Sequence, residues 1–138
     1  MPRLSRIAVR LSQVYLVVGS TFGALMLANK GIPFAPTLWA LLPSHVDVMF
    51  LGWMTQFALG IAFWILPRIA GSAPRGNEYW SRAGFALLNV GICISVLAPA
   101  WPTQHVLMIA RGFELTGVIL FSIGNWLRIY PLKFQIGK

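Results

Sequence analysis

The chain has 138 residues, of which 57% are hydrophobic and only 10% are charged, and its formal net charge is +8. An ordinary soluble domain carries about 25% charged residues, so this composition excludes a surface that faces water on all sides. A helix that spans a bilayer needs about 20 mostly apolar residues, and the sequence supplies four such stretches with little left over. We therefore predict a single all-α integral membrane domain over residues 1–138.

The predicted spans, in chain order, cover approximately residues 7–28, 46–66, 83–98 and 106–127. The first begins after three arginines, as a signal peptide would, but its apolar part is long and lacks a convincing A-x-A cleavage site, so we interpret it as a retained helix. Consecutive spans joined by short connections predict an up-and-down four-helix bundle. Prolines, whose missing N–H costs little in loops and first turns, mark the connections and the end of the last span: Pro33, Pro36, Pro43, Pro67, Pro99, Pro102 and Pro131.

The positive charges predict the orientation, because Lys and Arg gather on the cytoplasmic side of a membrane protein. Nine of them flank the ends of spans on one side: Arg3, Arg6, Arg10, Arg68, Arg75, Arg82, Arg128, Lys133 and Lys138. The opposite side has only Lys30. We therefore expect both termini to be cytoplasmic, in a multi-pass protein of the bacterial inner membrane. The lipid bilayer is the expected partner and nucleic acid is not, since no basic face on a soluble element is interleaved with aromatic residues.

The two histidines are the most informative polar residues, because each polar group inside a span is expensive in hydrocarbon. His45 opens the second span and His105 opens the fourth, so both are expected at the outer face. Those two helices are diagonal in an up-and-down bundle, and neighbouring axes about 8–10 Å apart leave roughly 11–14 Å across the diagonal. This gap suits a planar macrocycle whose iron accepts one imidazole from each side. We predict His45 and His105 as metal ligands of a b-type haem.

Small residues near the histidines support a cofactor site. At about 100° per residue, Met49, Gly52, Gln56 and Gly60 fall on the same broad face as the first histidine. Glycine there would let a flat cofactor lie close to the helix backbone, and Gly112 has a similar position two turns below the second histidine. The alternative is that both histidines are interfacial or capping residues and that the glycines serve close helix packing, as is common in membranes.

The remaining charged residues in the spans leave several alternatives open. Arg111 and Glu114 are three residues apart, so they can pair along the fourth helix. They point away from His105, so either they face a neighbouring helix or a second copy of the chain in a homo-oligomer, or the helix is turned and His105 is not a core ligand. Glu114 could also be a quinone or proton site. Asp47 could orient an imidazole or stay wet at the interface, and we favour the wet position.

Copper is a minor alternative to haem. The soft donors that would suit Cu(I) are Met26, Met49, Met54, Met108 and Cys93. They show no repeated M-x-x-M or C-x-x-C spacing. A single cysteine also excludes a C-x-x-C-H motif, and with it the usual covalent attachment of c-type haem.

One segment resembles the second helix of haem-copper oxidase subunit I. The residues that carry the resemblance are HVDVMFLGWM from His45, GIAFWILPR from Gly60, and the small-residue run after Arg68. The chain is also similar, in the same segment, to short membrane proteins linked to the nitric oxide response. The resemblance implies that His45 is an axial ligand of a low-spin haem.

The departures from that family limit what the resemblance implies. The oxidases have many more spans, and their second low-spin haem ligand comes from a late helix that this chain lacks. The histidines of the copper site are absent too, so oxygen reduction by this chain alone is not implied. His105 is then the only intramolecular histidine for the second axial position, and otherwise a methionine, water or another subunit fills it.

The sequence thus predicts a membrane haem b protein for electron transfer, or for sensing or handling a diatomic gas such as nitric oxide. If the chain is an enzyme, it is a haem-dependent oxidoreductase or a subunit of one. The expected partner is a redox protein or a respiratory complex. The alternative is a cofactor-free membrane subunit that assembles with such a complex or stabilises it.

Overall fold

The computed structural model describes residues 1–67, 78–101 and 104–129, and over these ranges the chain is helical with no strand. Four of its helices are long and apolar enough to cross a membrane. This confirms the all-α prediction and indicates a multi-pass membrane protein. Several residues used in the topology prediction lie outside the described ranges: Arg68, Arg75, Pro102, Pro131, Lys133 and Lys138.

The first helix, α1, covers Arg3–Gly31 and has 29 residues. At 1.5 Å per residue it is about 43 Å long, which exceeds the hydrocarbon thickness of a bilayer. A side chain near its end holds the following turn: Asn29 Oδ1 accepts hydrogen bonds from the backbone N–H of Phe34 at 3.1 Å and of Ala35 at 2.8 Å. With these bounds the helix extends beyond the predicted span of residues 7–28 at both ends.

The second span is one continuous helical run, Pro36–Ile65, built from four segments. These are the 3-10 helix η1 (Pro36–Leu41), α2 (Leu42–Asp47), the π-helix η2 (Val48–Thr55) and α3 (Gln56–Ile65). The span begins ten residues before the predicted start at residue 46. The physical reason is that Pro36 and Pro43 both occupy first-turn positions of successive segments, where proline is compatible with a helix.

The third and fourth spans form an antiparallel pair. Helix α4 covers Glu78–Leu97 and continues as the 3-10 turn η3 (Ala98–Ala100), and α5 covers Gln104–Asn125 and continues as η4 (Trp126–Arg128). Two glycines let the backbones approach closely. A Cβ on Gly84 would lie 2.5 Å from the carbonyl oxygen of Gly117, and a Cβ on Gly117 would lie 2.6 Å from the backbone nitrogen of Leu88. Both contacts involve backbone atoms, so glycine is required for this spacing.

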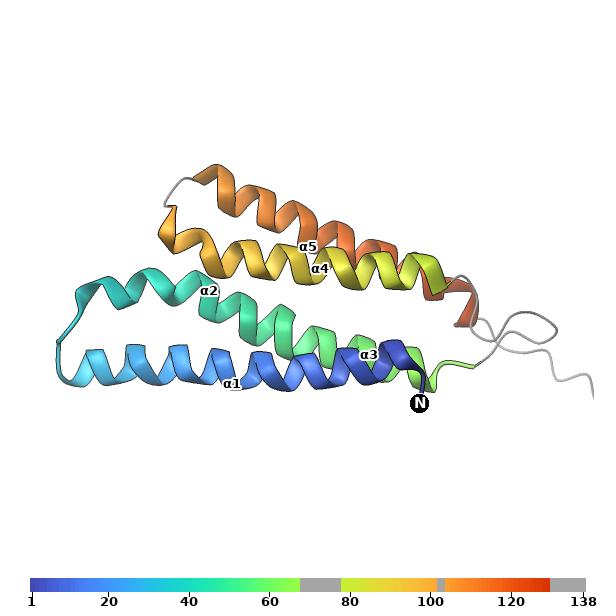
Figure 1. Ribbon diagram of the computed structural model, residues 1–138, viewed down its shortest axis with the longest axis horizontal. Coiled ribbons are helices and arrows are strands. Elements are labelled where there is room, and N and C mark those ends of the chain that lie inside the picture. The colour runs from blue at the N-terminus through green and yellow to red at the C-terminus, as the bar shows by residue number, and fades with distance from the viewer. Residues whose placement is uncertain (68–77, 102–103, 130–138) are drawn as a thin grey trace, which may run out of the picture.

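The bundle consists of two helical hairpins that lie one on the other (Figure 1). Helix α1 packs against the second span, α4 packs against α5, and the α2–η2 part of the second span contacts α4. The centre of the buried core is a cluster of Val48, Leu88 and Ile92, which joins the two hairpins.

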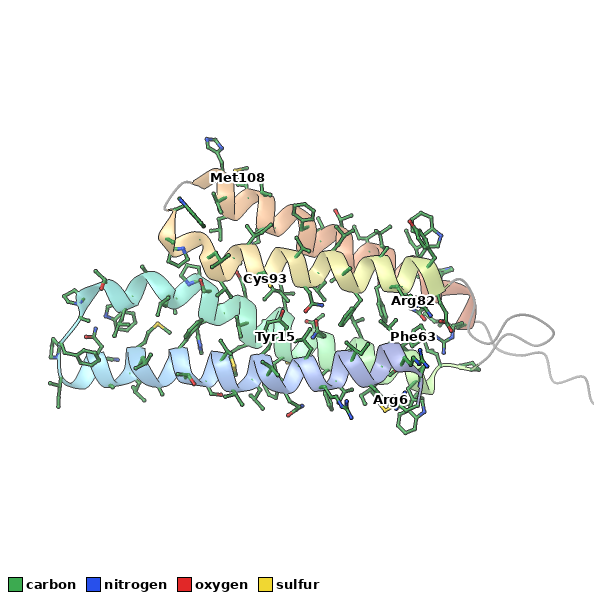
Figure 2. The ribbon with its side chains drawn as sticks, viewed as in Figure 1. Arg6, Tyr15, Phe63, Arg82, Cys93 and Met108 are labelled. Carbon is green, nitrogen blue, oxygen red and sulfur yellow. The ribbon has the colours of Figure 1, made fainter. Side chains whose placement is uncertain are left out.

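The N-terminal end of α1 and the C-terminal end of α5 lie at the same end of the bundle, called here the N-terminal end (Figure 1). Arg6 and Arg82 lie at this end and Met108 lies toward the other, the far end (Figure 2). The helices therefore alternate in direction, as predicted.

One buried arginine joins the ends of the second and fourth spans by hydrogen bonds at the N-terminal end of the bundle. The guanidinium of Arg128, on η4, donates hydrogen bonds to the carbonyl oxygens of Phe63 at 2.9 Å, Leu66 at 2.6 Å and Pro67 at 3.2 Å. It also donates to Asn125 Oδ1 at 2.7 Å and lies 5.0 Å from the centre of the Phe63 ring. The end of the fourth span thereby caps the free carbonyls at the end of the second.

Candidate functional site

Charged side chains from two spans meet inside the bundle toward its far half. Asp47 ends α2 and is 2% exposed, and Glu114 on α5 is 3% exposed. Arg111, one turn before Glu114, donates from NH1 to Asp47 Oδ1 and to Glu114 Oε2, the latter at 3.0 Å. This Asp47–Arg111–Glu114 cluster is therefore a contact between the second and fourth spans.

Two serines, Ser44 on the same helix and Ser95 on α4, complete the surroundings of Asp47. Ser95 Oγ on α4 donates to Asp47 Oδ2, and Ser44 Oγ on α2 donates to the carbonyl oxygen of Ser95 at 2.9 Å. Both Asp47 oxygens consequently accept hydrogen bonds. Glu114 differs, because its Oε1 is buried and has no hydrogen-bond partner among the described residues.

The charges of the cluster do not balance when both carboxylates are ionised. Asp47 and Glu114 are two of the three acidic residues in the chain, and the third, Glu78, pairs with Arg82 at 2.8 Å on the surface. The Arg111 side chain, at 46% exposed, is the part of the cluster that reaches the outside of the bundle. The cluster thus combines two buried carboxylates with one accessible cation.

A π-helix begins directly after Asp47. The segment η2, Val48–Thr55, has eight residues in this wide, uncommon geometry. Short π segments inside α-helices frequently mark functional sites. The segment includes Met49 and Gly52, both predicted as site residues, and it contacts both α1 and α4.

His45 lies against α1. Its Nδ1 is 2.8 Å from the carbonyl oxygen of Gly19, and a Cβ on Gly23 would lie 2.9 Å from the ring. Because a carbonyl only accepts hydrogen bonds, Nδ1 is the nitrogen that carries the proton in the neutral ring, which leaves the lone pair on Nε2. Metal-bound histidines usually donate their second nitrogen to such a carbonyl, so His45 has the tautomer of an Nε2 ligand.

His105 lies elsewhere. It is exposed near the start of α5, a helix that packs against α4, whereas His45 faces α1. The two predicted ligands therefore have different surroundings, and their shared ligation of a haem stays a prediction.

The glycines of the second span that were predicted to lie against a flat cofactor face α1. A Cβ on Gly52 would lie 2.7 Å from Tyr15, and one on Gly60 would lie 2.9 Å from Ala8. Met49 occupies the corresponding space beside Gly19, while Gly112 has open space around it. The face of the second span that was expected to take a flat cofactor is therefore packed against α1.

Among the described residues, no group of three or more His, Cys, Asp or Glu side chains could hold a metal ion. Of the soft donors considered for copper, Met54, Cys93 and Met108 are exposed and Met26 is buried.

Sequence reasoning predicted the Arg111–Glu114 pair but placed Asp47 wrongly. Asp47 was expected to stay wet at the interface, and it is instead buried against Arg111 and Ser95. The signal was present in the sequence: a cation inside an apolar span needs a counter-ion, and Asp47 is the carboxylate at similar depth on another span. Of the alternatives for Arg111 and Glu114, the structure shows contact with a neighbouring helix, through Asp47.

Comparison with family models, with curated proteins and with solved structures finds no match to this chain.

Proposed function

We propose that the chain is a proton-transferring component of a membrane, in which the Asp47–Arg111–Glu114 cluster binds one exchangeable proton. The observation that carries the proposal is the buried Oε1 of Glu114, which has no partner among the described residues in a cluster with two carboxylates and one guanidinium. Ionisable groups inside membrane spans are rare and typically serve proton or ion pathways.

Charge balance is the physical reason for the proton. With both carboxylates ionised, the cluster would carry one net negative charge among apolar helices, which is strongly disfavoured. Carboxylates that share a site do not readily ionise together. Asp47 already accepts from Ser95 and Arg111, so Glu114 Oε1 is the position that a proton would occupy. One proton there makes the cluster neutral.

In this proposal the proton exchanges beside the exposed Arg111 side chain. Glu114 lies ten residues from the start of α5, about 15 Å along the helix, which is close to its middle. Arg111 is nearer the far end and is half exposed, so its guanidinium lies between the buried carboxylates and the surroundings. Ser95 and Ser44 hold Asp47 in place while the proton at Glu114 enters or leaves.

Infrared spectroscopy of the protein in lipid vesicles tests this proposal, because the chain has only three acidic side chains. At neutral pH we expect the carbonyl stretch of a protonated carboxylic acid, with the small shift in D2O that shows an exchangeable proton. Glu114→Gln should remove the band, and the matched control Glu78→Gln should keep it. A folded wild-type protein without the band, or a band that survives Glu114→Gln, would contradict the proposal. The cluster would then have only a structural role, as a contact between the second and fourth spans.

We further propose that the chain lies in a bacterial inner membrane with its N-terminal end in the cytoplasm. Arg3, Arg6, Arg82 and Arg128 all belong to the N-terminal end of the bundle, while Lys30 belongs to the far end. This asymmetry supports the cytoplasmic location of both termini.

Haem binding is the second candidate function, favoured by the His45 tautomer together with the resemblance to the oxidase helix. In this proposal Nε2 of His45 would hold the haem iron, the carbonyl of Gly19 would fix the ring through Nδ1, and a group from outside this chain would supply the second ligand. A bound haem would supply one-electron or gas-binding chemistry for a redox partner or respiratory complex. A Soret band in purified protein, lost in His45→Ala, tests it. Colourless protein made with ample haem would favour a cofactor-free subunit.

A further inference from the structure

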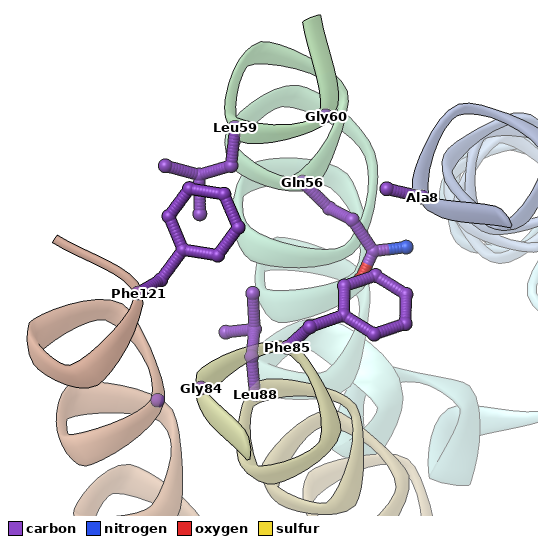
Figure 3. Close-up of a pocket in the computed structure, with 9 residues that line it drawn as sticks. Ala8, Gln56, Leu59, Gly60, Gly84, Phe85, Leu88 and Phe121 are labelled. Atoms are coloured by element: carbon purple, nitrogen blue, oxygen red, sulfur yellow. The ribbon is translucent and has the colours of Figure 1, made fainter. Parts of the chain in front are cut away.

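A small cavity lies between the two hairpins, toward the N-terminal end of the bundle. Its walls come from α1, α3, α4 and α5, including Ala8, Leu88 and Phe121 (Figure 3). The room inside for the centre of a water molecule is about 10 Å³, close to the volume that one water requires. The cavity is separate from the Asp47–Arg111–Glu114 cluster, and none of the three residues lines it.

Among the described residues that line this cavity, Gln56 alone has a polar side chain. Gln56 is 0% exposed, and neither its Nε2 nor its Oε1 has a hydrogen-bond partner among the described residues. Its amide group extends into the space between α1 and α4, near Ala8 and Phe85 (Figure 3). A primary amide with both ends unbonded in an apolar interior is strongly disfavoured, so the site calls for a partner.

We infer that the cavity binds one water molecule, which the Gln56 amide holds by hydrogen bonds. A single water can accept a hydrogen bond from the N–H and donate one to the carbonyl of the same amide, which satisfies both ends at once. Two hydrogen bonds lie within the range that buried waters make, and the volume admits one molecule. If the Gln56 amide were rotated by 180°, so that its nitrogen and oxygen changed places, the water could still bond to both atoms, since neither has another partner.

The position of the site indicates why a polar residue occurs here. Gln56 directly follows the π-helix η2 and begins α3. The cavity is bounded by Gly60, Gly84 and Gly117, where the helices approach each other too closely for larger residues to fill it. A water molecule occupies such a space without separating the helices.

Nuclear magnetic resonance tests the inference directly. In protein with ¹⁵N-labelled glutamine, in lipid nanodiscs, we expect a water cross-peak at the side-chain amide of Gln56, with the slow-tumbling sign of a bound water. The exposed Gln13 provides the matched control, because its side chain lies on the outside of α1 and lines no part of the cavity. Gln56→Met should remove the peak and Gln13→Met should leave it.

The inference is overturned if the assigned Gln56 amide shows no water peak while Gln13 does. Should Gln56→Met fail to fold, the assignment can be made in the wild-type chain through bonds from the Gln56 backbone. This outcome does not depend on the Glu114 proton, since the peak and the carboxylic acid band report different residues.

Discussion

Replacement of Arg128 by alanine should destabilise the bundle more than any other loss of a charge at its N-terminal end. The guanidinium is 2% exposed and donates to the carbonyls of Phe63, Leu66 and Pro67 at distances between 2.6 and 3.2 Å. A hydrogen bond to a charged group contributes about 1.5–3 kcal/mol, and bonds from one group do not add fully. With partial recovery by water at the helix end, we expect a loss of about 3–4 kcal/mol in the free energy of unfolding.

Two variants make the measurement specific. Arg128→Lys keeps the charge but has one nitrogen where the guanidinium has three, so about half of the loss should remain. Arg82→Ala removes an arginine side chain that is 67% exposed and pairs with Glu78, and it should cost less than about 0.5 kcal/mol. Reversible unfolding in mixed micelles, followed by circular dichroism, gives all three values. If the Arg128→Ala protein were as stable as the Arg82→Ala protein, the proposed capping of the second span by Arg128 would be wrong.

Three further predictions concern packing, ligation and topology. Gly117→Ala should lower the free energy of unfolding by about 1–3 kcal/mol, because its Cβ would meet the backbone of α4. Gly112→Ala should raise it by about 0.5–1 kcal/mol, since a Cβ there meets nothing within 4 Å. The same unfolding assay separates the two variants. In haem-loaded protein, absorption spectra should show a lost Soret band for His45→Ala and an unchanged one for His105→Ala, and an effect of equal size at both sites would restore shared ligation. A C-terminal reporter should be active only in the cytoplasm, and its labelling on intact cells would reverse the orientation.

The fold was predictable because apolar runs and charges act over local stretches of sequence. Four spans follow from composition alone, and their order determines alternating directions. The start of the second span was missed by ten residues because Pro36 and Pro43 were interpreted as loop markers, although proline is equally compatible with a first helical turn. The π-helix could not be predicted, since it depends on how α1 and α4 pack against the second span.

The candidate site was only partly predictable, because helical periodicity gives faces and does not say which faces meet. The spacing of Arg111 and Glu114 predicted their contact, which the structure confirms at 3.0 Å. The burial of Asp47 depends on the approach of α2 to α5, which is a tertiary contact. The glycines beside His45 are compatible with a cofactor bed or with close helix packing, and in the structure α1 fills that space.

The protonation state of Glu114 tests the central proposal most directly. Selective ¹³C labelling of glutamate gives two side-chain carboxyl signals, from Glu78 and Glu114, since no other glutamate is present. At neutral pH we expect a carboxylate signal for Glu78 and a protonated carboxyl signal for Glu114. Asp47→Asn leaves one carboxylate for Arg111, so it should convert the Glu114 signal to that of a carboxylate. A Glu114 carboxylate in the folded wild-type protein, unchanged by Asp47→Asn, would contradict a proton site in the cluster.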